Sequence, residues 1–74
     1  MYNEKNLTKR QVRVLHLLSD GKHYSVIEIA NTLFIGDPRS LIRDLRKEGI
    51  VVKDEWITTR DGQGRYKRYW VENK

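Results

Sequence analysis

The chain has 74 residues, no cysteine, and 15 lysine and arginine residues against 10 aspartate and glutamate residues, a formal net charge of +5. Without cysteine it has neither disulfides nor a thiolate metal site. Its apolar runs are far shorter than the about 20 residues of a membrane-spanning helix, and the N-terminal segment lacks the apolar region of a signal peptide. We therefore expect one complete, soluble, cytoplasmic domain over residues 1–74. The basic excess favours a nucleic-acid partner, although a basic surface that only aids solubility would look the same.

The first predicted helix covers residues 9–20. Thr8 and Gln11 have the spacing of a capping box, in which each side chain bonds the backbone N–H of the other residue. Gly21 is expected just beyond the C-terminal end. The apolar positions recur at helical spacing and comprise Val14, Leu15 and Leu18.

A second helix is predicted over residues 25–33. Ser25 and Glu28 repeat the capping-box spacing. A short extended segment, residues 22–25, precedes it. The buried side of this helix is expected to comprise Ile27, Ile29, Ala30 and Leu33.

The third helix is predicted over residues 38–48. Asp37 is a suitable N-cap, and Pro38 fits the first helical position because its missing N–H would be unsatisfied there anyway. Gly49 is expected to end the helix. Helices two and three are joined by about four residues that include a glycine, which is typical of a helix-turn-helix.

The remaining chain predicts a β-hairpin with strands over residues 50–59 and 65–72. These segments are rich in β-branched and aromatic residues and flank the sequence Asp-Gly-Gln-Gly, in which Gly62 and Gly64 can supply positive φ. A hairpin directly after a helix-turn-helix is a wing. The residues expected to face the core are Val52, Trp56, Tyr69 and Val71, and those expected on the opposite face are Tyr66, Arg68 and Trp70.

The third helix carries its charges in separate arcs. On a helical wheel the acidic residues Asp44 and Glu48 lie to one flank, and the basic residues lie almost opposite the core position Leu41. Neighbouring cations at i,i+4 repel by about 0.2–0.5 kcal/mol per pair, which favours a contact surface for DNA over a merely solvated face. The basic arc comprises Arg39, Arg43, Arg46 and Lys47.

Several side chains are candidate contacts to the DNA backbone. Ser25 combines a hydroxyl with the free N–H groups of a helix N-terminus, and Arg46 and Lys47 lie on the basic arc. A basic hairpin tip suits a phosphate strand or the minor groove, unless its charges serve only to protect a strand edge. The candidate wing contacts are Arg60, Arg65, Lys67 and Arg68.

The chain resembles winged helix-turn-helix DNA-binding domains, and in particular small phage and prophage helix-turn-helix proteins. The resemblance rests on "T..Q..VL..L..G..YS..EIA..L.I....S.I.DLR..GI" over residues 8–50, followed by Trp56, Gly64 and Tyr69. It implies an α+β fold of three helices with a C-terminal β-hairpin wing. It also implies duplex DNA binding with the third helix in the major groove and the wing on flanking backbone or in the minor groove. Base contacts are implied for Arg39, Ser40 and Arg43, although Leu41 and Ser40 stand where the family often has an arginine.

The function expected from these features is a phage- or prophage-type transcriptional regulator, associated with the nucleoid and able to form a homodimer on DNA. One alternative is an excisionase-like factor that bends DNA. Others are a winged helix that binds a protein through Tyr66 and Trp70, and a single-strand binder that uses the hairpin aromatics. We expect no enzyme, cofactor or metal site, because the two histidines lack metal-ligand spacing and no nucleotide-binding motif is present.

Overall fold

The computed structural model describes residues 7–72, so residues 1–6 and 73–74 of the expected domain lie outside the described part. The described chain is an α+β fold with three helices and a three-stranded antiparallel sheet, an arrangement compatible with a winged helix. The elements in chain order are α1 (Lys9–Leu18), β1 (Tyr24–Ser25), α2 (Val26–Leu33), α3 (Pro38–Lys47), β2 (Lys53–Thr58) and β3 (Arg65–Trp70).

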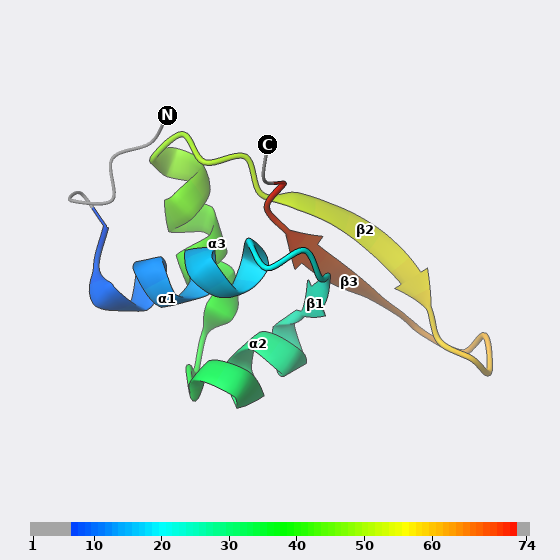
Figure 1. Ribbon diagram of the computed structural model, residues 1–74. Coiled ribbons are helices and arrows are strands. Elements are labelled where there is room, and N and C mark those ends of the chain that lie inside the picture. The colour runs from blue at the N-terminus through cyan, green and yellow to red at the C-terminus, as the bar shows by residue number, and fades with distance from the viewer. Residues whose placement is uncertain (1–6, 73–74) are drawn as a thin grey trace.

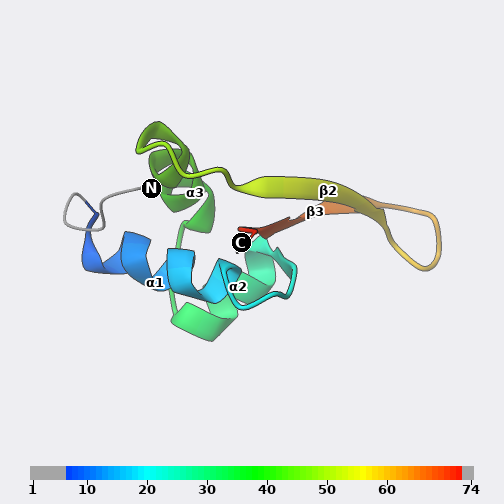
Figure 2. The ribbon, with the colours of Figure 1, turned by 45° about the horizontal axis from the view of Figure 1, so that its top comes forward.

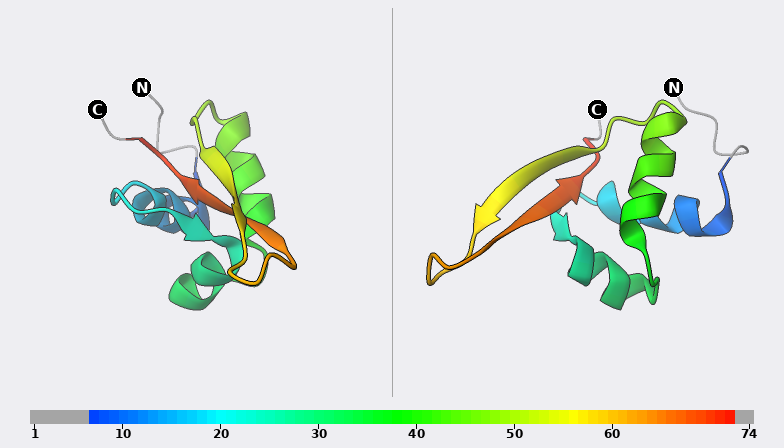
Figure 3. Two further views of the ribbon diagram at one scale, coloured as in Figure 1. Left: turned by 90° about the vertical axis from the view of Figure 1, so that its right-hand side faces the viewer. Right: turned by 180° about the vertical axis from the view of Figure 1, so that it is seen from behind.

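The three helices gather on one side, and the β2–β3 hairpin extends away from them as a long arm (Figures 1 and 2). The strand order is β1-β3-β2, so β1 pairs with β3 at the base of the hairpin through Tyr24 opposite Tyr69 and Ser25 opposite Arg68. Seen from behind, α3 stands in front of α1, and the hairpin lies to one side of α3 (Figure 3, right). One face of α3 is therefore left uncovered beside the hairpin.

The predicted helix starts are confirmed. Both capping boxes are present: Thr8 and Gln11 bond each other's backbone N–H at the start of α1, and Ser25 and Glu28 do the same for α2. At α3 the Asp37 side chain accepts from the Ser40 amide, and Pro38 occupies the first turn. These local bonds satisfy N–H groups that have no partner within the helix.

Helix α1 ends at Leu18, two residues earlier than expected. Asp20 instead forms a turn, in which its carboxylate accepts hydrogen bonds from the Lys22 amide and the Tyr24 hydroxyl. The hydroxyl contact lowers the pKa of Asp20 and raises the pKa of Tyr24. The short polar side chain of an aspartate competes with helical backbone bonds in this way, which is why the apolar period alone overestimates the helix.

Helix α3 ends at Lys47, one residue before the predicted end at 48, and Gly49 follows the C-cap as expected. Gly49 has φ of +88° and donates to the Arg46 carbonyl, while Ile50 donates to the Leu45 carbonyl, both at 3.1 Å. This is the Schellman pattern, and it brings the apolar residues at its two ends, Leu45 and Ile50, into the core. The motif thereby fixes the direction in which the chain leaves α3 for the sheet.

Helix α2 ends on a residue that is unusual for its place. Phe34 has φ of +55° in the left-handed region, where glycine is favoured, and its side chain is 91% exposed. Replacing Phe34 with glycine is expected to raise the free energy of unfolding by about 0.5–1 kcal/mol, because glycine adopts this conformation without the Cβ clash. Urea denaturation measures the change. Phe34→Ala removes the ring but keeps the clash, so a gain of the same size in that variant would contradict the explanation.

The core lies between the helices and the base of the sheet. It contains Ile29 from α2, but Ile27 is 72% exposed, so the prediction that Ile27 is buried was wrong. Val26 takes its place beside the core, since positions 26, 29, 30 and 33 share one helical face and position 27 does not. The core comprises Val14, Leu15, Leu18, Ile29, Ile35, Ile42, Leu45, Ile50, Val52, Tyr69 and Val71.

The strands are shorter than the predicted ranges 50–59 and 65–72. Ladder pairing starts at Lys53 opposite Trp70, because the preceding segment leaves the sheet to reach α3 and the Val71 amide bonds the Leu18 carbonyl of α1 at 2.9 Å. At the hairpin tip only Gly62 has positive φ, and the expectation for Gly64 was wrong. The start of the first predicted strand and the end of the second thus connect the sheet to the helices.

Trp56 was predicted to face the core but is 58% exposed, whereas Val52, Tyr69 and Val71 are buried as predicted. Asp54 is opposite Tyr69 in the ladder, and Trp56 is opposite Lys67, one step further along the same face. The face was therefore predicted correctly, but the ring lies beyond the part of the hairpin that packs on the helices.

Candidate nucleic-acid interface

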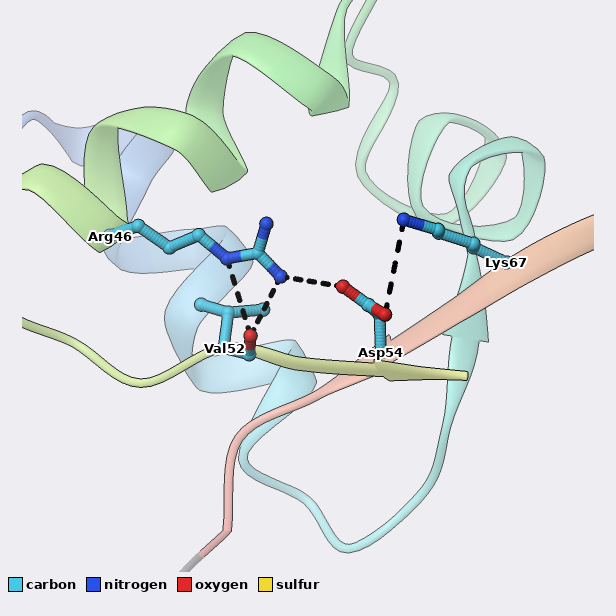
Figure 4. Close-up of polar contacts among 4 residues, drawn as sticks. All are labelled: Arg46, Val52, Asp54 and Lys67. Atoms are coloured by element: carbon cyan, nitrogen blue, oxygen red, sulfur yellow. Dashed lines mark hydrogen bonds and ion pairs between the residues drawn. The ribbon is translucent and has the colours of Figure 1, made fainter. Parts of the chain in front are cut away.

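Two contacts, one on each side, set the rotation of α3. On the α1 side, the Gln11 side-chain amide donates to the Asp44 carboxylate at 3.3 Å. On the sheet side, the Arg46 guanidinium donates to the Val52 carbonyl at 2.7 Å and to the Asp54 carboxylate at 2.9 Å (Figure 4). The arc between these contacts faces away from the core.

That outward arc carries Arg39, Arg43 and Lys47, all exposed. Within residues 7–72 these side chains form no hydrogen bond or ion pair. By contrast, every acidic residue in the same range except Glu48 accepts a hydrogen bond from another residue of the chain or forms an ion pair with one. The acids are used to hold the fold, and the cations of the arc remain available for an external anion.

Arg46 belongs to the sheet contact and not to the free arc. Its guanidinium bonds a backbone carbonyl and Asp54, and Lys67 approaches the other oxygen of Asp54 at 3.9 Å (Figure 4). Arg46, for which we predict a contact to the DNA backbone, joins α3 to β2 within the chain.

The hairpin cations divide between its two faces. Arg65 and Lys67 share the face of Trp56, with the Arg65 Cζ and the Lys67 Nζ each 5.0 Å from the centre of its ring. Arg68 points to the opposite face, where its Nε lies 3.7 Å from a Glu55 carboxylate oxygen. Of the predicted hairpin contacts, Arg65 and Lys67 therefore lie together, and Arg68 is separated from them.

Arg60 lies in the exposed turn at the tip, which is held by its own polar contacts. Asp61 accepts from the Thr59 hydroxyl at 2.7 Å and from the Gln63 amide at 2.9 Å. These bonds, the hydroxyl first, hold the pKa of the Asp61 carboxyl below its usual value. The carboxylate at the tip is thus bonded within the turn, although Asp61 and Arg60 are both exposed.

An open groove of about 720 Å³ lies between the hairpin and the N-terminal turns of α2 and α3. Arg39 contributes from α3, Ile27 from α2, and Trp56, Arg65 and Lys67 from the hairpin. None of the described residues that line this groove is acidic. The groove therefore joins the outward arc of α3 to the basic face of the hairpin.

The two predicted serine contacts both take part in capping interactions, Ser25 as the N-cap of α2 and Ser40 as a partner of Asp37, the N-cap of α3. The Ser25 hydroxyl accepts from the Glu28 amide at 3.1 Å, and Ser25 also lines the groove. The Ser40 hydroxyl donates to the Asp37 carbonyl at 3.2 Å. Ser25 keeps its hydroxyl proton and Ser40 keeps oxygen lone pairs for a further hydrogen bond.

The Tyr66 and Trp70 surface, a predicted protein-docking face, is partly used within the chain. The Trp70 ring stacks on His23 with centroids 3.9 Å apart and an interplanar angle of 10°, and His23 bonds Glu55 at 2.7 Å. Tyr66 is 41% exposed and borders the groove. Of these two side chains, only Tyr66 is exposed and free of a stacking partner, so it alone could dock a protein through its ring.

Residues 7–72 contain no group of three or more histidine and acidic residues placed to hold a metal ion. In the same range no helix is long and apolar enough to cross a bilayer. Comparisons with known proteins found no matching protein family, curated protein or solved structure.

Proposed function

We propose that this chain is a winged helix-turn-helix domain that binds double-stranded DNA, with α3 as the recognition helix and the β2–β3 hairpin as the wing. The observation that supports the proposal is the set of free cations on the outward arc of α3, which continues through the groove onto the hairpin. A basic surface without internal partners suits the phosphate backbone, which supplies most of the affinity in DNA binding.

Helix α3 has the size and chemistry for the major groove. Its ten residues span about 15 Å at 1.5 Å per residue, and the major groove, about 12 Å wide, admits one helix. An arginine fork can bond guanine O6 and N7 together, and a serine hydroxyl can bond either a base or a phosphate. We assign base contacts to Arg39, Ser40 and Arg43, and phosphate contacts to Lys47 and Ser25.

The wing contacts in this proposal are Arg60, Arg65 and Lys67. Arg46 is not included, because it bonds Val52 and Asp54. Arg68 is not included, because it lies beside Glu55 on the face opposite to Trp56. Lys67 also lies 3.9 Å from Asp54, but it is retained because it lines the groove. The role as a phage- or prophage-type transcriptional regulator extends the proposal on the strength of the sequence resemblance, and DNA bending of the excisionase kind is the alternative use of the same surface.

The salt dependence of duplex binding tests the proposal. We expect retardation of a mixed-sequence duplex in a low-salt gel, and a slope of log affinity against log salt between about −2.7 and −4.5, for three to five neutralised phosphates at about −0.9 each. Fluorescence anisotropy of a labelled duplex over a range of salt concentrations gives the slope. No retardation, or a salt slope near zero, would refute the proposal and favour a winged helix that binds protein.

A further inference from the structure

Trp56 is the most exposed aromatic residue of the hairpin, ahead of Tyr66. Its ring is 58% exposed, and two cations, Arg65 and Lys67, lie over it at 5.0 Å. A tryptophan ring attracts cations to its face and limits the freedom of their side chains. The ring therefore lies at the centre of an ordered basic patch that faces the groove.

The groove is lined by both apolar and cationic side chains. Ile27, 72% exposed, forms part of one wall, and Trp56 lies on the hairpin side. The cations around them are Arg39, Arg65 and Lys67. A sugar-phosphate strand offers both complementary surfaces, because each deoxyribose has an apolar C–H surface and each linkage carries one negative charge. Charge complementarity thus favours an anionic partner over an apolar one, and the mixture of apolar and charged surface favours a nucleic-acid strand.

The geometry of a duplex brings one strand to this place. Each backbone separates the major groove from the neighbouring minor groove, so a protein that places α3 in the first and a hairpin beside the second must hold a backbone between them. The groove lies between the N-terminal turn of α3 and the hairpin. This step rests on the function proposed above.

We infer that one backbone strand of the duplex lies in this groove, with Trp56 packed against a deoxyribose and Arg65 and Lys67 bound to the phosphates on either side. Ile27 contacts the same strand from α2, and Arg39 marks the point where the strand meets the recognition helix. The hairpin then binds DNA by an apolar contact as well as by charge. Trp56 belongs to the DNA contacts and not to the core.

Matched substitutions at Trp56 and Arg65 separate the apolar contact from charge. Trp56→Thr keeps a β-branched residue in the strand and is expected to weaken duplex binding about tenfold, which corresponds to about 1.4 kcal/mol, with the salt slope unchanged. Arg65→Gln is expected to make the slope less negative by about 0.9, because one phosphate contact is lost. Trp56→Phe, which keeps an aromatic face, is expected to bind within about threefold of the original chain, or about 0.7 kcal/mol.

Tryptophan fluorescence supplies a second measurement. The difference between the original chain and Trp56→Phe isolates the emission of Trp56 from that of Trp70, which lies on the opposite face of the hairpin against His23. We expect duplex DNA to change the Trp56 signal at least as strongly as oligo(dT) at equal nucleotide concentration. Thermal unfolding of each variant checks that it is folded.

Three results would overturn the inference while leaving duplex binding in place. If Trp56→Thr binds duplex as tightly as the original chain, the DNA backbone strand does not contact Trp56. A loss of slope in Trp56→Thr as large as that in Arg65→Gln would mean that the ring only positions the cations. Stronger quenching by oligo(dT) than by duplex would make Trp56 a stacking platform for unpaired bases. Failure of the original chain to bind duplex at all is a separate result, and it would refute the proposed function itself.

Discussion

Replacing Arg39, Arg43 and Lys47 together with glutamine is expected to weaken duplex binding at least about 100-fold without unfolding the domain. Each lost contact is worth about 1 kcal/mol or more, and 1.4 kcal/mol is tenfold in affinity. The salt slope should become less negative by about 0.9 if only Lys47 contacts a phosphate, and by up to about 2.7 if all three do. Anisotropy titrations at several salt concentrations measure both quantities.

The stability of this triple variant provides an independent check. The three cations form no hydrogen bond or ion pair within residues 7–72, and they repel one another along α3. Removing the repulsion is expected to keep or slightly raise the free energy of unfolding, by about 0.2–0.5 kcal/mol per i,i+4 pair. A loss of several kcal/mol would show that these side chains support the fold.

A control with the same net charge separates local contact from overall charge. Glutamine at Lys9, Arg10 and Lys22 also removes three charges, but from α1 and the loop after it. Its binding is expected to stay within about threefold, or about 0.7 kcal/mol, of the original chain. If both triple variants lose affinity equally, binding depends on net charge alone and the assignment of α3 is wrong.

Single substitutions on α3 distinguish the roles within the arc. Arg43→Ala is expected to cost about 1–3 kcal/mol and to relax preference at one base pair, whereas equal loss on every sequence would identify a phosphate contact. Arg46→Gln is expected to lower stability and leave the salt slope unchanged, because Arg46 bonds Val52 and Asp54 within the fold.

Leu45→Ala is expected to lower the free energy of unfolding by about 2–5 kcal/mol. Leu45 is fully buried, and its carbonyl accepts the bond from Ile50 that turns the chain toward the sheet. A domain of 74 residues has a total stability of about 4–11 kcal/mol at about 0.05–0.15 kcal/mol per residue. The substitution should therefore lower Tm by about 10 °C or more, at about 4–8 °C per kcal/mol, as circular dichroism can measure.

Val51→Ala is the matched control for Leu45→Ala. Val51 is 70% exposed and lies just beyond the turn that follows α3. Its truncation is expected to change the free energy of unfolding by no more than about 0.5 kcal/mol. Equal losses in the two variants would contradict the placement of the core on Leu45 and its neighbours.

Much of the helical part was predictable from neighbouring residues. The caps at Thr8, Ser25 and Asp37 and the glycine end at Gly49 all formed as the sequence indicated. Each of these depends on hydrogen bonds between residues three to five positions apart, so the signal is present in a short segment of sequence. The errors in helix length, such as the early end of α1 at Leu18, came from competing polar turns.

The hairpin was predictable in its existence and in its faces but not in its depth of burial. Alternation correctly placed Trp56 on the same face as Tyr69, but only the ladder register shows that Trp56 lies one step beyond the core. Counting residue pairs outward from Tyr69 could have suggested this, had the register been known. Ile27 was misassigned for a related reason, because a short helix offers two apolar faces and the packing chooses one.

The starts of the helices, the turn at Gly49 and the gathering of cations on one arc of α3 could all be predicted, because each depends on residues a few positions apart. Which basic side chains of α3 and the hairpin are free of internal partners depends on the folded arrangement. Arg46 and Arg68 carry the same charge as Arg43 and Arg65, but the fold brings Asp54 and Glu55 to the first pair and not to the second. Such pairing depends on strand register and helix rotation, which distant parts of the chain set together.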